Sequence, residues 1–195
     1  MFNLKIIIAS TRPGRKGPML GSWIFQVAKE NGGFDVSLLD LAIINLPFMD
    51  EPHHPRLKQY QHDHTWNWSK IIDEADAFII VTPEYNFGYP ASIKNALDFL
   101  FHEWSYKPVG FVSYGGIAGG TRSVQMLKQV VTAQKMMPVM ESVNVPFFMN
   151  YISEEETFVP NEGVKNSANA MLSELSKWTR ALKTLRNNND GKMLA

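Results

Sequence analysis

Three short segments of this chain bring together residue types that bind ligands. The first carries two hydroxyls, three cations and two glycines, and it reads Ser10-Thr11-Arg12-Pro13-Gly14-Arg15-Lys16-Gly17. Free backbone N–H groups ahead of a helix attract an anion, and hydroxyl and guanidinium groups donate hydrogen bonds to a phosphate. The segment has neither the Gly-Lys-Ser/Thr ending of a Walker A loop nor the GxGxxG dinucleotide pattern. It therefore predicts another kind of anion-binding loop, with a solvated basic turn as the alternative.

The second segment is rich in aromatic residues and reads Thr82-Pro83-Glu84-Tyr85-Asn86-Phe87-Gly88-Tyr89-Pro90. Its two prolines stiffen the loop, while Asn86 and Gly88 tolerate unusual backbone angles. A stiff loop with planar side chains suits a planar ring system, held by stacking and by main-chain hydrogen bonds. The alternative is a turn whose aromatic side chains pack on the core.

The third segment holds four glycines and reads Ser113-Tyr114-Gly115-Gly116-Ile117-Ala118-Gly119-Gly120. Glycines allow a ligand to lie directly against the backbone. The spacing does not meet the GxGxxG dinucleotide pattern. A flexible loop that caps the following helix is the alternative interpretation.

Each of these segments follows a short apolar run, and the runs are Leu4–Ala9, Asp76–Val81 and Pro108–Ser113. Continuous hydrophobicity is typical of a strand that is covered on both faces, as in a parallel sheet. Phe34–Leu39 alternates more and suits an outer strand, and Ser142–Phe148 is a fifth candidate. These five runs predict a sheet with the three segments at one edge.

Apolar residues at helical spacing fill the gaps between the runs. Two of the expected helices end at Asn31-Gly32-Gly33 and before Asp76. Three further helices are expected at Ala91–His102, Arg122–Gln134 and Asn166–Leu185. Alternating strands and helices predict an α/β doubly wound sheet with helices on both faces, forming one domain over residues 1–186 with a flexible tail at 187–195. The irregular segment 39–59 is either a surface excursion or a substrate lid.

Ligands of an open parallel sheet bind beyond the carboxyl ends of its strands. A flavodoxin-like strand order, 2-1-3-4-5, makes the first, third and fourth strands adjacent. The three segments then form a row: a phosphate pocket, an aromatic clamp and a glycine floor. A ligand with a phosphate at one end and a flat heteroaromatic ring at the other fits that row, and flavin mononucleotide (FMN) is such a ligand.

The composition excludes several function classes. Of 195 residues, 45% are hydrophobic and 19% are charged, which is ample apolar material for a core. The 19 Lys and Arg residues balance the 19 Asp and Glu residues, so no basic field attracts nucleic acid or a membrane surface. The chain contains no cysteine, which excludes disulfides and thiol nucleophiles. With no signal peptide pattern or membrane span, we expect a cytoplasmic protein that binds neither nucleic acid nor membrane.

At these three segments the chain resembles the NADPH-dependent FMN reductase family, the flavodoxin-like quinone, azo-dye and chromate reductases. The most specific match is the Pro-Glu-Tyr-Asn loop of residues 83–86, which leads into Lys94-Asn95-Ala96-Leu97-Asp98. The resemblance covers roughly residues 4–145 and also includes Gly119, Gly120 and Arg122. Gly17 and Pro18 depart from the family, which commonly has a further phosphate-binding Ser or Thr there.

The resemblance implies a role for eleven residues. Ser10, Thr11 and Arg12 would bind the FMN phosphate. Pro83, Glu84, Tyr85 and Asn86 would line the ribityl chain and the ring, and Ser113, Tyr114, Gly115 and Gly116 would hold the pyrimidine end. It also implies a homodimer or homotetramer in which the helix 92–102 packs near the partner's flavin. Trp104 and Tyr106 either border that flavin or fill the core.

The expected activity is hydride transfer from NADPH or NADH, through FMN, to a small acceptor such as a quinone, an azo compound, free flavin or a metal oxyanion. The cofactor carries this chemistry, so we assign no catalytic side chain. Arg15 and Lys16 either attract the extra phosphate of NADPH or are solvated. The rival hypotheses are a non-enzymatic FMN-binding electron carrier or redox-responsive interaction module, and a flavin-free regulatory protein.

Four histidines cluster in the chain at positions 53, 54, 62 and 64, near several carboxylates. Imidazoles and carboxylates can bind a divalent metal. The cluster lacks a metal-ligand motif such as His-Glu-x-x-His. We therefore expect a solvated loop and helix start here and no metal site.

Overall fold

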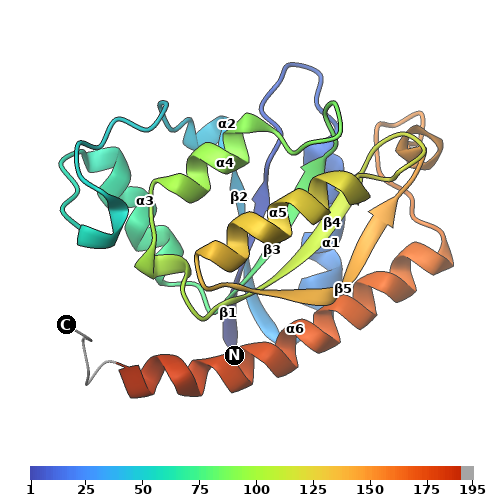
Figure 1. Cartoon of the computed structure of the whole chain (residues 1–195). Helices are drawn as coiled ribbons and strands as arrows, with labels where there is room; N and C mark the ends of the chain where they lie inside the picture. The colour runs from blue at the N-terminus through green and yellow to red at the C-terminus, as the bar shows by residue number, and fades with distance from the viewer. Residues whose placement is uncertain (190–195) are drawn as a thin grey trace.

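The computed structural model describes residues 1–189 and shows one parallel sheet between two layers of helices (Figure 1). The strand order β2-β1-β3-β4-β5 confirms the predicted doubly wound order. Every neighbouring pair of strands runs parallel, which places all carboxyl ends at one edge. The strands are β1 (Phe2–Ile8), β2 (Phe34–Asp40), β3 (Ala77–Pro83), β4 (Pro108–Tyr114) and β5 (Met137–Val145).

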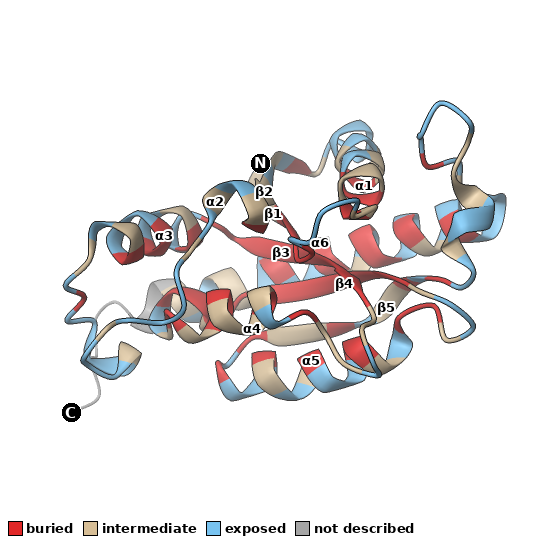
Figure 2. Cartoon of the chain, turned by 90° about the horizontal axis from the view of Figure 1, so that it is seen from above, coloured by how far each residue is buried: buried red, intermediate tan, exposed pale blue. Residues whose placement is uncertain are grey.

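Helices cover both faces of the sheet, as the alternating pattern predicted, and bury it almost completely (Figure 2). One face packs against α1 (Gly17–Asn31) and α6 (Glu162–Asn189). The other face packs against α2 (Leu41–Ile44), α3 (Asp63–Asp73), α4 (Ala91–Asp98) and α5 (Thr121–Ala133). The central strands β3 and β4 are buried along their whole length, which is why their sequences are continuously apolar.

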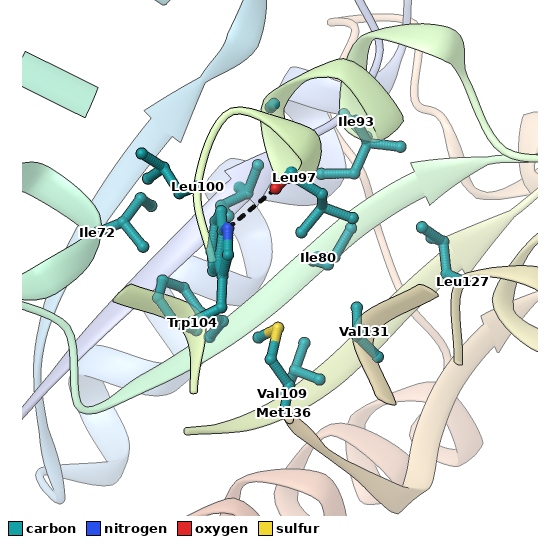
Figure 3. Packing of buried hydrophobic residues seen from close by; sticks show 14 of the residues in the cluster. Ile72, Ile80, Ile93, Leu97, Leu100, Trp104, Val109, Leu127, Val131 and Met136 are labelled. Atoms are coloured by element: carbon teal, nitrogen blue, oxygen red, sulfur yellow. Dashed lines mark hydrogen bonds between the residues drawn. The ribbon is translucent and has the colours of Figure 1, made fainter. Parts of the chain in front are cut away.

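The core on the α3–α5 side is built around large side chains (Figure 3). Phe78 and Ile80 of β3 point to this side, while Ile79 and Val81 point to the opposite core. Trp104 is fully buried here, and its indole nitrogen donates a hydrogen bond to the Leu97 carbonyl at 3.2 Å. Trp104 therefore fills the core and cannot border a partner's flavin.

Several element boundaries differ from the sequence prediction. The fifth strand begins at Met137 and ends before Pro146, which has no N–H to continue the ladder. Helix α4 stops at Asp98, and the short 3₁₀ helix η2 (His102–Trp104) follows. Helix α6 begins at Glu162 and reaches Asn189, so the first three residues of the expected tail are helical. Residues 190–195 of that tail lie outside the described part of the chain.

The segment 39–59 is tied down rather than loose. Asp40 caps α2 by accepting a hydrogen bond from the Ala42 amide at 3.0 Å. Further on, the Asn95 side chain of α4 accepts from the Met49 amide at 3.0 Å and donates to the Pro47 carbonyl at 2.7 Å. The segment therefore forms an ordered strap along the outer side of α4. It continues through the 3₁₀ helix η1 (Pro55–Leu57).

Within residues 1–189, no helix combines the length and the apolar character that crossing a bilayer requires.

Candidate active site

The three predicted segments surround one cavity of about 450 Å³, which we call the central cavity. It lies beyond the carboxyl ends of the adjacent strands β1, β3 and β4. Of the predicted site residues, Ser10, Thr11 and Ser113 are outside the lining. The lining residues are Arg12, Arg15, Lys16, Pro83, Glu84, Tyr85, Asn86, Tyr114, Gly115, Gly116 and Phe148.

Ser10 lies fully buried beneath the first loop, where its hydroxyl accepts a hydrogen bond from the Tyr114 hydroxyl at 3.3 Å. Burial raises the pKa of Tyr114 to about 12, so this phenol stays neutral and donates. Gly17 packs against both groups, because a Cβ there would lie 2.4 Å from Ser10 Oγ and 3.0 Å from the Tyr114 hydroxyl. The departure from the family at position 17 thus has a packing reason: a larger residue would displace the Ser10 and Tyr114 side chains.

Arg15 has a structural partner. Its guanidinium makes two hydrogen bonds of 2.7 Å to the Asp40 carboxylate and one of 2.8 Å to the Ser10 carbonyl. Both side chains of the ion pair are largely buried. The pair fixes the backbone of the first loop against the end of β2, and Arg15 is committed to that contact.

Arg12 is exposed, and its guanidinium lies 6.0 Å from the centre of the Tyr85 ring. Among the residues that the structure describes, no carboxylate forms an ion pair with Arg12. It is therefore available to an anion in the central cavity. Thr11 is also exposed and faces a neighbouring cavity of about 410 Å³ between α2 and α4.

The aromatic segment folds into a tight hairpin. Tyr85 and Gly88 exchange two backbone hydrogen bonds of 2.9 Å each. The two residues between them, Asn86 and Phe87, have φ values of 49° and 71°. Left-handed angles at two non-glycine residues store strain in this loop, and such strain concentrates at functional sites.

Arg122, at the start of α5, holds this hairpin in place. Its guanidinium pairs with the Glu84 carboxylate and lies 3.8 Å above the centre of the Phe87 ring. The Arg122 amide also donates to Glu84 at 3.3 Å. Sequence reasoning did not place Arg122 in the site, although it belongs to the motif that carried the family resemblance.

The glycine segment packs closely on the ends of β4 and β5. Ser113 is buried under it and donates a hydrogen bond to the Gly119 carbonyl at 2.8 Å, so its side chain supports the loop from below. Gly120 has φ of 83°, and a Cβ there would lie 2.8 Å from the Tyr114 amide. A Cβ on Gly116 would meet open space, which leaves the floor of the central cavity free for a ligand.

Phe148 is a lining residue that the sequence analysis missed. It belongs to the 3₁₀ helix η3 (Phe148–Tyr151), and its amide donates to the Gly115 carbonyl at 3.3 Å. Its ring packs edge-on against Tyr114, with 5.1 Å between the ring centres. Phe148 extends the aromatic wall of the central cavity beyond Tyr114.

The donor set and shape fit a flavin mononucleotide. The volume is within the range of about 300–1,000 Å³ of small-molecule sites. The lining offers the Arg12 guanidinium for a phosphate. It also offers Tyr85, Tyr114 and a glycine floor for a flat ring.

A family model described as NADPH-dependent FMN reductase matches residues 2–150. The chain belongs to this family. It is 41% identical over 145 residues to an NAD(P)H-dependent FMN reductase of Schizosaccharomyces pombe, covering 72% of each chain. It is 33% identical over 172 residues to the Saccharomyces cerevisiae NAD(P)H-dependent FMN reductase LOT6, covering 83% of this chain and 89% of the yeast protein. A potato NAD(P)H:quinone oxidoreductase is 32% identical over 123 residues, with 58% and 61% of the two chains covered.

Solved structures support the fold. FerB, a flavoenzyme NAD(P)H:(acceptor) oxidoreductase from Paracoccus denitrificans, superposes with a TM-score of 0.73 at 19% identity, over 93% of this chain and 98% of FerB. A WrbA-like flavodoxin from Agrobacterium tumefaciens superposes with a TM-score of 0.56 at 17% identity, over 93% and 99%. The fold is therefore flavodoxin-like, as predicted.

The histidine cluster lies on the strap and the start of α3, away from the central cavity. The His62 and His64 rings stack with 5.1 Å between their centres, and His64 Nε2 lies 2.9 Å from an Asp50 carboxylate oxygen. Within residues 1–189, no three His, Cys, Asp or Glu side chains are grouped as a metal site. The cluster connects the strap to α3.

Proposed function

We propose that this chain is an FMN-dependent oxidoreductase that takes a hydride from NADPH or NADH and passes the electrons to a small acceptor of the quinone type. One observation carries the proposal: an exposed cation, an aromatic wall and a glycine floor, from three separate loops, line a single cavity. The family of the chain supports it. When bound, the flavin supplies the redox chemistry, and the protein supplies binding and orientation.

The eleven predicted residues have different parts in this proposal. Arg12 binds the phosphate from the exposed side of the first loop, and Ser10 fixes the loop from below. Thr11, which was predicted to bind the phosphate, instead faces the neighbouring cavity. The main chain of residues 83–86 and the Tyr85 ring hold the flavin ring. Tyr114, Gly115 and Gly116 hold its pyrimidine end, and Ser113 supports their loop.

The acceptor and the oligomeric state belong to the same proposal. The potato relative is named a quinone oxidoreductase, which supports a quinone-type acceptor. We propose a homodimer or homotetramer that packs through α4 and the strap, where Phe48 and Ile43 are 84% and 80% exposed. Because NADPH and NADH are reductants of the cell interior, we place the enzyme in the cytoplasm.

An absorption spectrum with an anaerobic NADPH titration tests the activity. We expect a yellow protein whose flavin bleaches on addition of NADPH, followed by steady-state NADPH oxidation when a quinone is added. Bound FMN that NADPH fails to reduce would instead identify an electron carrier. A colourless protein that takes up no added FMN would identify a flavin-free regulatory protein.

A further inference from the structure

The side chain of Lys16 lies on the boundary between two cavities. It lines the central cavity, and its ammonium pairs with the Glu156 carboxylate at 2.8 Å. Glu156 in turn lines a second cavity of about 470 Å³, which lies between α1 and the hairpin 152–158. Figure 1 shows this hairpin in orange, just ahead of α6. The Lys16–Glu156 ion pair therefore separates the central cavity from this second cavity, which we call the α1 cavity.

The α1 cavity has an aromatic lining with polar groups beside it, which can accept a purine. Trp23 and Phe158 meet edge to face, with 5.1 Å between their ring centres, and both line the α1 cavity. Ser22 and Gln26, one helical turn apart on α1, add polar groups that can pair with the edge of a base. The remaining lining residues are Pro18, Met19, Glu156 and Thr157. A flat apolar ring with polar edges matches this surface.

The Lys16 ammonium can leave the Glu156 carboxylate and pair with another anion, whereas the Arg15 guanidinium is held by Asp40. Arg15 is fixed by the largely buried Asp40. Glu156 has a side chain that is 72% exposed and sits near the tip of the hairpin. The nearby ammonium of Lys16 holds the pKa of Glu156 below its ordinary value, so Glu156 is fully ionised at neutral pH. A single exposed ion pair contributes little to stability, and a phosphate can replace the carboxylate.

We propose that Lys16 binds the 2′-phosphate of NADPH in place of Glu156 and that the α1 cavity takes the adenosine. This inference rests on the proposed function, because a nicotinamide that reaches a flavin in the central cavity must leave its adenosine outside it. NADPH and NADH share the nicotinamide and the adenosine and differ only in this phosphate. Lys16 and Glu156 therefore set the preference between the two coenzymes, and the Trp23 surface sets the affinity for both.

Steady-state kinetics with both coenzymes, at saturating FMN, separate these roles. Lys16→Gln is expected to raise KM for NADPH about tenfold and to leave KM for NADH unchanged. Lys29→Gln, at the other end of α1, makes the same charge change and should alter neither. Trp23→Leu should raise KM for NADPH and NADH by the same factor. A parallel change of both KM values in Lys16→Gln, or no change, overturns the assignment of Lys16.

The hairpin side of the ion pair gives an independent test. Glu156→Gln removes the competing carboxylate and should lower KM for NADPH without affecting NADH. Glu155→Gln is the matched control, since it removes the same charge from the same hairpin next to the pair. The preference for NADPH should also fall as ionic strength rises, because the contact is between two charges. An equal effect of the two Gln variants would show that only the overall charge of the hairpin matters.

A binding measurement separates this inference from the proposed function. Titration calorimetry with adenosine 2′,5′-bisphosphate and with 5′-AMP needs no flavin turnover. The unaltered protein should bind the bisphosphate more tightly, and Lys16→Gln should remove that difference. If NADPH fails to reduce bound FMN while this difference is present, the proposed function is wrong and Lys16 still recognises the phosphate. If reduction proceeds while the difference is absent, the inference is wrong.

Discussion

At the scale of single residues, the site depends on contacts beneath the surface that faces the ligand. Ser10, Gly17 and Tyr114 pack into one contact under the first loop, and Arg15 and Asp40 fix that loop from the side. In the proposed complex, these contacts set the direction of the backbone that receives the phosphate, beneath the exposed Arg12.

Gly17→Ala should weaken FMN binding by about tenfold or more. The new Cβ would lie 2.4 Å from Ser10 Oγ, so the contact between Ser10 and Tyr114 under the loop must shift. Overpacking of this kind costs about 1–3 kcal/mol of unfolding free energy. A flavin fluorescence titration and urea unfolding measure the two effects. Gly163→Ala, where a Cβ meets ordinary contacts at the start of α6, is the control and should change neither. Unaltered FMN affinity in Gly17→Ala would contradict this role.

Arg122→Lys should also lower the affinity for FMN, by about five- to tenfold. Lysine keeps the charge opposite Glu84 but loses the planar group that covers the Phe87 ring at 3.8 Å. The strained hairpin then loses the contact that holds it. Near-ultraviolet circular dichroism and the flavin titration report on this loop. Arg180→Lys, an exposed residue of α6, should behave like the unaltered protein. Full affinity in Arg122→Lys would mean that charge alone holds the loop.

At the scale of elements, one buried cation joins α3 to β4. The Lys107 ammonium donates hydrogen bonds of 2.9 Å to the carbonyls of Ile72 and Asp73, the last residues of α3. The Ile72 carbonyl also accepts from the Ala75 amide at 3.2 Å, and Lys107 completes the hydrogen bonding of this helix end. Burial lowers the pKa of Lys107 to about 8.

The stability of the protein should therefore change with pH in the alkaline range. Between pH 8 and the ordinary lysine pKa of 10.5, the unfolded chain binds more protons at this group than the folded chain. The contribution of Lys107 to the unfolding free energy thus rises with pH across this window and is lowest below pH 8. Urea unfolding measures the unfolding free energy of the unaltered protein and of Lys107→Met. The value for the unaltered protein minus the value for the variant should rise by more than about 1 kcal/mol from pH 8 to pH 10. A difference that stays constant with pH would contradict this.

The strands also show which parts of the fold and of the site can be located from sequence patterns alone. The buried strands β1, β3 and β4 are continuous apolar runs, and this located the three loops and their order. Strand β5 is an edge strand with Met140 exposed and Pro138 in its ladder, so its start had no such pattern. Phe148 reaches the cavity only because Phe147 turns the chain with φ of 47°. The Arg15–Asp40 pair joins residues far apart in sequence, and composition alone cannot reveal it.

At the scale of the whole molecule, one surface exposes apolar side chains, and the proposed assembly buries them. Phe48 and Ile43 protrude from the strap and α2, next to the cavity that Thr11 and Ser92 line. The strap is held to α4 by Asn95, so the protruding side chains have a fixed position. A rigid apolar surface is suited to association.

Phe48→Asp should convert the oligomer to a smaller species, because the carboxylate would be buried at the interface. Light scattering coupled to size-exclusion chromatography measures the mass. Met140→Asp is the matched control, since Met140 is 85% exposed on the edge strand β5. A monomeric unaltered protein would contradict the proposed assembly. Dissociation by Met140→Asp instead would place the interface on β5.

All five strands point the same way, so the amino ends of β1 and β3 lie at the opposite edge of the sheet from the central cavity (Figure 1). The far end of α6 is anchored at that same edge, where Arg186 donates to Asp76 at 2.7 Å. A purification tag or an electrode linker joined before Phe2 would therefore leave the cavity facing the solution. Immobilised in this way, the protein would present its redox site to dissolved substrates.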